Sequence, residues 1–134
     1  MTDNAPMHLI AVVAALVAAA VHLWFFVLES VQFTQPKVYA RFGLRSAEDA
    51  AIVRPMAFNQ GFYNLVLAIG ILVGLAFVAA GQVEAGRGVV LFACATMVGA
   101  GVVLLASNRR FLIGASIQAV PPAIALIAAL FLAP

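Results

Sequence analysis

The chain has 134 residues, of which 66% are hydrophobic and 9% are charged, and its formal net charge is +2. Soluble domains carry about a quarter of charged residues, and a fold this small leaves too much surface exposed to hide so many apolar side chains from water. The weak positive charge gives no reason to expect nucleic acid as a partner. The composition therefore predicts an integral membrane protein, and the length allows a single domain over residues 1–134.

Four apolar segments are long enough to cross a bilayer as helices, which takes roughly 20 residues. We expect these spans at about 9–28, 56–80, 88–106 and 111–132. None shows the alternation of a membrane β-strand, and the first has no preceding Lys or Arg and is too long for a signal peptide. Because short second and third connections make neighbouring helices antiparallel, the predicted fold is an all-α integral membrane four-helix antiparallel bundle.

The first connection, Ser30 to Pro55, is the only long polar segment, and we expect it to be structured. Pro36 can begin a short helical turn that mixes apolar and basic residues, a composition that suits the lipid headgroup zone. These residues are Lys37, Val38, Tyr39, Arg41 and Phe42. Ser46, followed by Glu48 and Asp49, is typical of a helix N-cap, and it predicts a short helix leading towards Pro55.

The basic residues are distributed unevenly over the loops. Loop one has Lys37, Arg41, Arg45 and Arg54, loop three has Arg109 and Arg110, and the second connection has Arg87 alone. By the positive-inside rule, loops one and three should be cytoplasmic and both termini outside. The sequence thus predicts a multi-pass protein of the plasma membrane, specifically a bacterial inner membrane.

Polar residues inside the predicted spans are few and gather on particular helix faces. In the first span His22 and Glu29 are seven residues apart, which places them on one face. In the second span one arc holds Asn59, Gln60, Tyr63 and Asn64 together with Gly70 and Gly74. Intramembrane polar groups usually face inward, and small residues allow close helix contact. We therefore expect these faces, and that of Gln118 in the fourth span, to form the packed interior.

The depth of these groups suggests a shared site. Counting 1.5 Å per residue, Glu29 and Asn59 lie near the cytoplasmic surface, while His22, Asn64 and Gln118 lie roughly 5–15 Å below it, as does Gln60. Pro121 and Pro122 lack the N–H groups that would bond the carbonyls of Ile117 and Gln118, so a kink there would add acceptors. The pattern predicts one inward-opening polar vestibule lined by the first, second and fourth spans.

Each of these residues also has a simpler interpretation. The amides can serve as hydrogen-bonded contacts between helices, and His22 can be a satisfied core histidine rather than an acid–base partner of Glu29. Trp24 is more typical of an interface anchor than of a ligand stack, and Cys94 of a small core hydrophobe. No metal or cofactor is expected, since the histidines lie at opposite ends of the first span without further ligands.

Several short motifs resemble a known family. They are Trp24 to Glu29, Phe42-Gly43-Leu44, Met56-Ala57 followed by Asn59-Gln60-Gly61-Phe62-Tyr63-Asn64, and Gln118-Ala119-Val120-Pro121. Together they resemble an uncharacterised family of small bacterial four-helix membrane proteins, domain of unknown function thirteen-oh-four. The resemblance covers nearly the whole chain and implies the fold but no activity.

A weaker resemblance is to the MAPEG family, the membrane-associated proteins of eicosanoid and glutathione metabolism, which are four-helix chains that form trimers. Asn59 matches the Asn of their Arg-Ala-x-x-Asn-x-x-Glu signature, and Gln118 begins a similar Gln-x-x-Pro run. Pro55 and Phe62 stand at the Arg and Glu positions. The resemblance therefore implies architecture and trimerisation rather than glutathione chemistry.

The leading functional hypothesis is that the protein binds a small amphipathic or lipid-like molecule. If the protein is an enzyme, it would also transform that molecule. The ligand-binding candidates are Asn59, Gln60, Tyr63, Asn64 and Gln118, and the candidate catalytic pair for proton transfer is His22 with Glu29. One alternative is an oligomeric proton-coupled transporter or exporter, and another is a structural membrane subunit without a ligand. Membrane lipid and a second copy of the chain are the expected partners, with a trimer as the candidate homo-oligomer, because small residues mark several helix faces.

Overall fold

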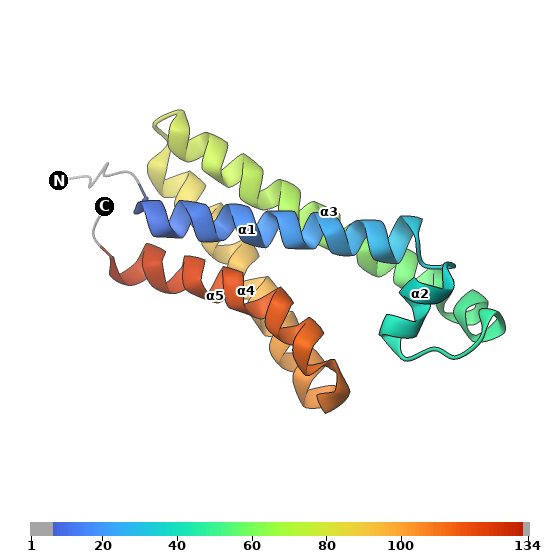
Figure 1. The fold of residues 1–134 in the computed structure, drawn as a ribbon. Coiled ribbons are helices and arrows are strands. Elements are labelled where there is room, and N and C mark those ends of the chain that lie inside the picture. The colour runs from blue at the N-terminus through green and yellow to red at the C-terminus, as the bar shows by residue number, and fades with distance from the viewer. Residues whose placement is uncertain (1–6, 133–134) are drawn as a thin grey trace. The chain divides into compact units, whose positions relative to one another are not determined.

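The computed structural model describes residues 7–132, and its regular elements there are all helices (Figure 1). In chain order they are α1 (Leu9–Phe26), the π-helical turn η1 (Val27–Val31), α2 (Pro36–Tyr39), the 3-10 turn η2 (Ala40–Phe42), α3 (Ala47–Ala79), α4 (Val83–Ser107), the 3-10 turn η3 (Arg109–Phe111) and α5 (Leu112–Phe131). Four stretches are long and apolar enough to cross a membrane: Leu9–Val31, Ala47–Ala79, Val83–Ser107 and Arg109–Phe131. The predicted all-α membrane fold with four spans is confirmed.

Helix α3 is longer than the sequence suggested. We expected a short helix before Pro55 and a separate span from Met56, but a single helix runs from Ala47 to Ala79 with Pro55 inside it. Its predicted start is confirmed, because the Asp49 N–H donates to Ser46 Oγ at 3.0 Å. Pro55 removes only the bond to the carbonyl of Ala51, an exposed residue, and water can satisfy that carbonyl.

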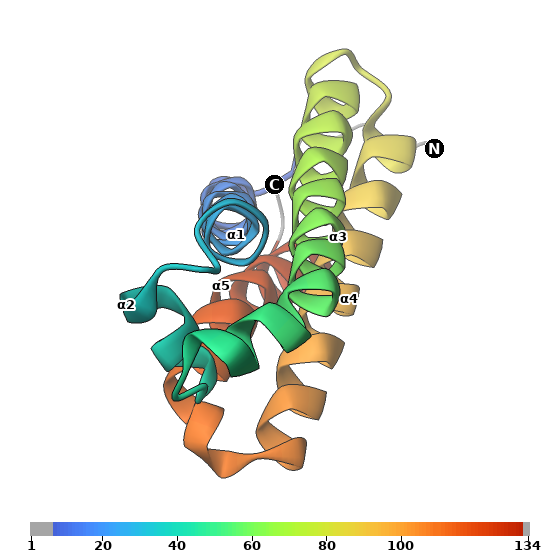
Figure 2. The same ribbon diagram turned by 90° about the vertical axis from the view of Figure 1, so that its right-hand side faces the viewer.

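The first connection is structured, as expected. Pro36 occupies the first turn of α2, where its missing N–H costs nothing, and Gly43 ends η2 with a φ of 80°, which favours glycine. A small apolar cluster joins this connection to the beginning of α3; its members are Phe33, Ala50 and Ala57, with Tyr39, Phe42, Leu44 and Val53 packed against them. Figure 2 shows α2 beside the first turns of α3.

The chain divides into two compact units, which are residues 22–66 and residues 1–21 with 67–134. We call the first the polar unit and the second the alanine-rich unit. The alanine-rich unit has a core of small and aliphatic side chains: Ala11, Ala14, Ala15, Ala18 and Ala19 of α1, with Ala68, Ile71, Val90, Ala93, Cys94, Met97, Ala125, Ala128 and Ala129, joined by Met7. Cys94 is fully buried in it, so its interpretation as a core hydrophobe is confirmed.

Glycines allow the helices of the alanine-rich unit to approach closely. A Cβ on Gly74 of α3 would lie 2.9 Å from the Gly86 carbonyl oxygen and 2.8 Å from a methyl of Val90. A Cβ on Gly101 of α4 would lie 2.7 Å from Ala119 Cβ. The expected close packing is therefore found at Gly74, whereas Gly70 faces only Ala93 Cβ at 4.0 Å.

Candidate functional site

Helix α1 ends in a π turn rather than a regular α turn. The Gln32 N–H donates to the carbonyl of Val27 at 2.9 Å, a bond that spans five residues. Such turns are rare and are frequently found at functional sites. Here the turn buries two consecutive residues, Leu28 and Glu29. It therefore places a carboxyl group in the interior near the end of the first span.

Glu29 is paired with Asn64 of α3. The Asn64 Nδ2 amide donates to Glu29 Oε2 at 2.7 Å, and the two residues are only 4% and 9% exposed. Burying a carboxyl group is costly unless it is hydrogen-bonded, and in a membrane span the groups that bear this cost are usually functional. Two residues to which the sequence analysis assigned separate roles thus form one buried pair.

The pair depends on a close approach between η1 and α3. The Ser30 hydroxyl donates to the carbonyl of Phe58 at 2.9 Å. A Cβ on Gly61 would lie 3.1 Å from both Glu29 Cβ and the Ser30 nitrogen, and closer still to Ser30 Oγ. Since Gly61 and Asn64 are one turn apart on α3, the missing side chain of Gly61 lets Glu29 come within reach of Asn64.

Sequence reasoning missed the roles of Ser30 and Gly61 in this contact, although it named Gly61 as part of the family motif. The sequence signal for this contact is a glycine three residues before an intramembrane amide, Gly61 and Asn64, together with a Glu-Ser pair at the end of another span. Interpreting it required knowledge that these two segments meet, and separate helix patterns do not contain that information.

His22 lies in the interior of the polar unit, and a row of partly exposed aromatic side chains lies beside the Glu29–Asn64 pair. His22 is fully buried, and its ring packs edge-on against Phe25 with centroids 6.0 Å apart. Phe26 and Phe62 also pack edge-on, at 5.3 Å, and Phe62 in turn contacts Phe58 at 5.0 Å. Proton transfer between His22 and Glu29 stays a prediction, because the shared-face argument assumed a regular helix and the π turn begins between the two residues.

Comparison with known proteins identifies the family. A family model described as "Protein of unknown function (DUF1304)" matches residues 16–130. The chain belongs to this family. The match includes every residue of the Glu29–Asn64 site. No curated protein and no solved structure matches, so the resemblance to the MAPEG family is not shown.

The other polar residues that we singled out in this DUF1304 chain are placed differently from one another. Asn59 and Gln60 are exposed and Tyr63 is 61% exposed, so the expectation that this whole arc faces the packed interior is wrong for three of its four polar residues. The end of the first span covers one side of α3, that of Gly61 and Asn64, and leaves these three uncovered. Gln118 is half-buried on α5, and its membership of the same site stays a prediction.

Proposed function

We propose that this protein binds a small amphipathic, lipid-like molecule in the membrane, with the Glu29–Asn64 pair as the anchor for its polar end. The observation that carries the proposal is the buried carboxyl–amide hydrogen bond within a span. Contacts between membrane helices through polar side chains contribute only about 1 kcal/mol each. A carboxyl group held by a π turn and a glycine contact is a costly way to obtain so little stability.

The chemistry of the pair suggests what the ligand carries. A carboxylate oxygen accepts hydrogen bonds, so the matching ligand group is an amine or a hydroxyl. Phe26 and Phe62 lie on the same two segments and provide apolar surface for the remainder of the molecule. His22 is the second titratable group of this interior and could exchange a proton with a bound ligand.

A proton-coupled transporter or exporter is the second candidate. The buried position of Glu29 favours it, since carboxyl groups inside spans serve as proton relays in transporters. The distribution of polar groups weighs against it. Alternating access uses polar groups at the midplane and on both sides, whereas the buried polar side chains of the described residues all lie within residues 22–66.

The test is native mass spectrometry of the purified protein, followed by identification of any released molecule. Glu29→Gln keeps the shape of the side chain and replaces its carboxyl group with an amide, and Glu84→Gln is the matched control, because Glu84 is exposed in the first turn of α4. We expect the same bound molecule on the wild type and the control. Occupancy of Glu29→Gln should fall by about tenfold, as expected for the loss of a hydrogen bond to the ligand.

Two results would separate the proposals. Retention of the molecule by Glu29→Gln, or its absence from the wild type, would contradict ligand binding at this pair. Flux driven by a pH gradient in proteoliposomes that Glu29→Gln abolishes would favour the transporter instead.

A further inference from the structure

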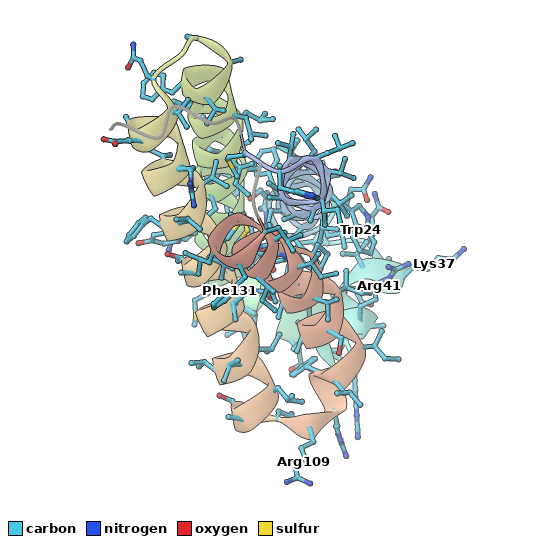
Figure 3. The ribbon with its side chains drawn as sticks, turned by 90° about the vertical axis from the view of Figure 1, so that its left-hand side faces the viewer. Trp24, Lys37, Arg41, Arg109 and Phe131 are labelled. Atoms are coloured by element: carbon cyan, nitrogen blue, oxygen red, sulfur yellow. The ribbon has the colours of Figure 1, made fainter. Side chains whose placement is uncertain are left out.

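A second group of polar residues lies on the surface of the polar unit. The guanidinium carbon of Arg41 is 5.8 Å from the centroid of the Trp24 indole, a cation–π contact. Trp24 in turn stacks on Phe25, with centroids 5.5 Å apart and an interplanar angle of 23°. Figure 3 shows Trp24, Lys37 and Arg41 near one another, with the Lys37 side chain extending outward. The indole and the guanidinium are thus fixed in one arrangement.

The two cations are held by a short, well-anchored segment. Lys37 in α2 and Arg41 in η2 are four residues apart in consecutive helical turns, so they project from the same side. Val38 between them is buried at 5% exposure. Tyr39 and Phe42 of the same segment pack against the apolar cluster that contains Phe33. Both basic residues are exposed, and Trp24 is 41% exposed. The segment therefore presents two positive charges at a defined spacing beside an aromatic surface.

The contact with Trp24 indicates at which level of the membrane these charges are expected. Trp24 belongs to the last third of the span Leu9–Val31, which is where tryptophan marks the membrane–water boundary. Among residues 7–132, neither Lys37 nor Arg41 has a carboxylate partner; the contact of Arg41 is with the indole. Phosphate groups of phospholipids are the anions available at that level.

We propose that Trp24, Lys37 and Arg41 form a binding site for the headgroup of an anionic phospholipid. The Arg41 guanidinium can bind two phosphate oxygens at once, and the Lys37 ammonium adds a point charge. The glycerol backbone of the lipid would lie along the exposed indole of Trp24. This site uses none of the residues of the Glu29–Asn64 pair and stands independently of the proposed ligand.

Trp24 provides a direct readout, because it is the single tryptophan of the chain. The protein is reconstituted into phosphatidylcholine vesicles in which a minor fraction of one lipid carries brominated acyl chains, which quench nearby indoles. The quenching ratio between brominated phosphatidylglycerol and brominated phosphatidylcholine is measured at equal fractions. We expect the anionic lipid to be enriched at Trp24 by about tenfold in the wild type.

The variants distinguish a site from diffuse charge. Lys37→Gln with Arg41→Gln should reduce the ratio to about one. Arg45→Gln with Arg54→Gln removes the same charge from two other exposed positions of loop one and should leave the ratio unchanged. Because each ratio compares two lipids on the same protein, changes in the intrinsic emission of Trp24 cancel.

Three results would overturn the proposal. One is equal quenching by both lipids in the wild type, a measurement that needs no variant to fold. Another is an equal decrease of the quenching ratio in both double variants, which would mean that the total charge of loop one, and not a specific site, attracts the anionic lipid. The third is reversal of the enrichment by soluble glycerol phosphate or inorganic phosphate, which would make a soluble anion the occupant rather than a lipid.

Discussion

The two units of this chain have interiors of opposite chemistry. The alanine-rich unit is filled by alanine and aliphatic side chains and brings its helices together at glycines. The polar unit contains His22, Glu29 and Asn64, which are the buried polar side chains of residues 7–132. A uniform membrane bundle would spread such costly groups or avoid them. Their restriction to residues 22–66 separates a part of the chain with an apolar core from a part that buries polar side chains, and it supports the proposed ligand site in the second part.

The largest expected effect is a difference between the two units in labelling by a membrane-impermeant reagent, because their connecting segments are predicted to lie on opposite sides of the membrane. Single cysteines at Glu48 and at Gln82, both exposed, are introduced in a Cys94→Ala background. Glu48 is preferable to its neighbour Ser46, whose hydroxyl caps α3. If loop one is cytoplasmic, an impermeant thiol reagent applied to intact cells should label residue 82 and not residue 48. Equal labelling of both positions would contradict the predicted orientation.

The next largest effect is expected at the glycine contact of the alanine-rich unit. Gly74→Leu would force α3 away from Gly86 and Val90, and overpacking of this kind costs about 1–3 kcal/mol or more. We expect poor expression and aggregation on size-exclusion chromatography. Gly88→Leu is the matched control, because nothing lies within 4 Å of a Cβ at Gly88. Normal behaviour of Gly74→Leu would mean that this packing is not required.

A smaller effect is expected for the buried pair of the polar unit. Asn64→Ala leaves the Glu29 carboxyl buried without its amide donor, which should lower the free energy of unfolding by about 1–3 kcal/mol. Adding Glu29→Leu to Asn64→Ala removes the stranded polar group and should restore part of this loss. The coupling is measured with a double-mutant cycle from denaturant unfolding in detergent. Simple additivity would show that the two side chains stabilise the protein separately.

The smallest effect is expected at the exposed amides of the same unit. Asn59→Ala and Gln60→Ala remove side chains that are exposed on α3, so the free energy of unfolding should change by no more than about 0.5 kcal/mol. The same denaturation assay measures it. If these residues also hold a ligand, native mass spectrometry will show its loss without loss of stability. Marked destabilisation would instead indicate that they are covered in an oligomer.

Features that depend on local chemistry were readable from the sequence. The four spans follow from runs of apolar residues because lipid forces each backbone polar group to bond within its own helix. The Ser46 cap and the Pro36 turn follow from the bonding capacity of single residues. Each of these predictions needs only the residues within a turn or two, which explains why the structure confirms them.

The candidate site was decided by the tertiary structure. Periodicity placed Asn59, Gln60 and Asn64 on one arc, but it contained no information about which part of that arc another helix would cover. The bond from Asn64 to Glu29 joins residues 35 positions apart, and it needs both the π turn of η1 and the space left by Gly61. Such contacts depend on which segments meet and at what distance, because a hydrogen bond is made or lost within a fraction of an ångström. The sequence by itself therefore determined that polar groups enter the membrane, and only the contact of η1 with residues 58–64 of α3 decided that Glu29 and Asn64 are buried together.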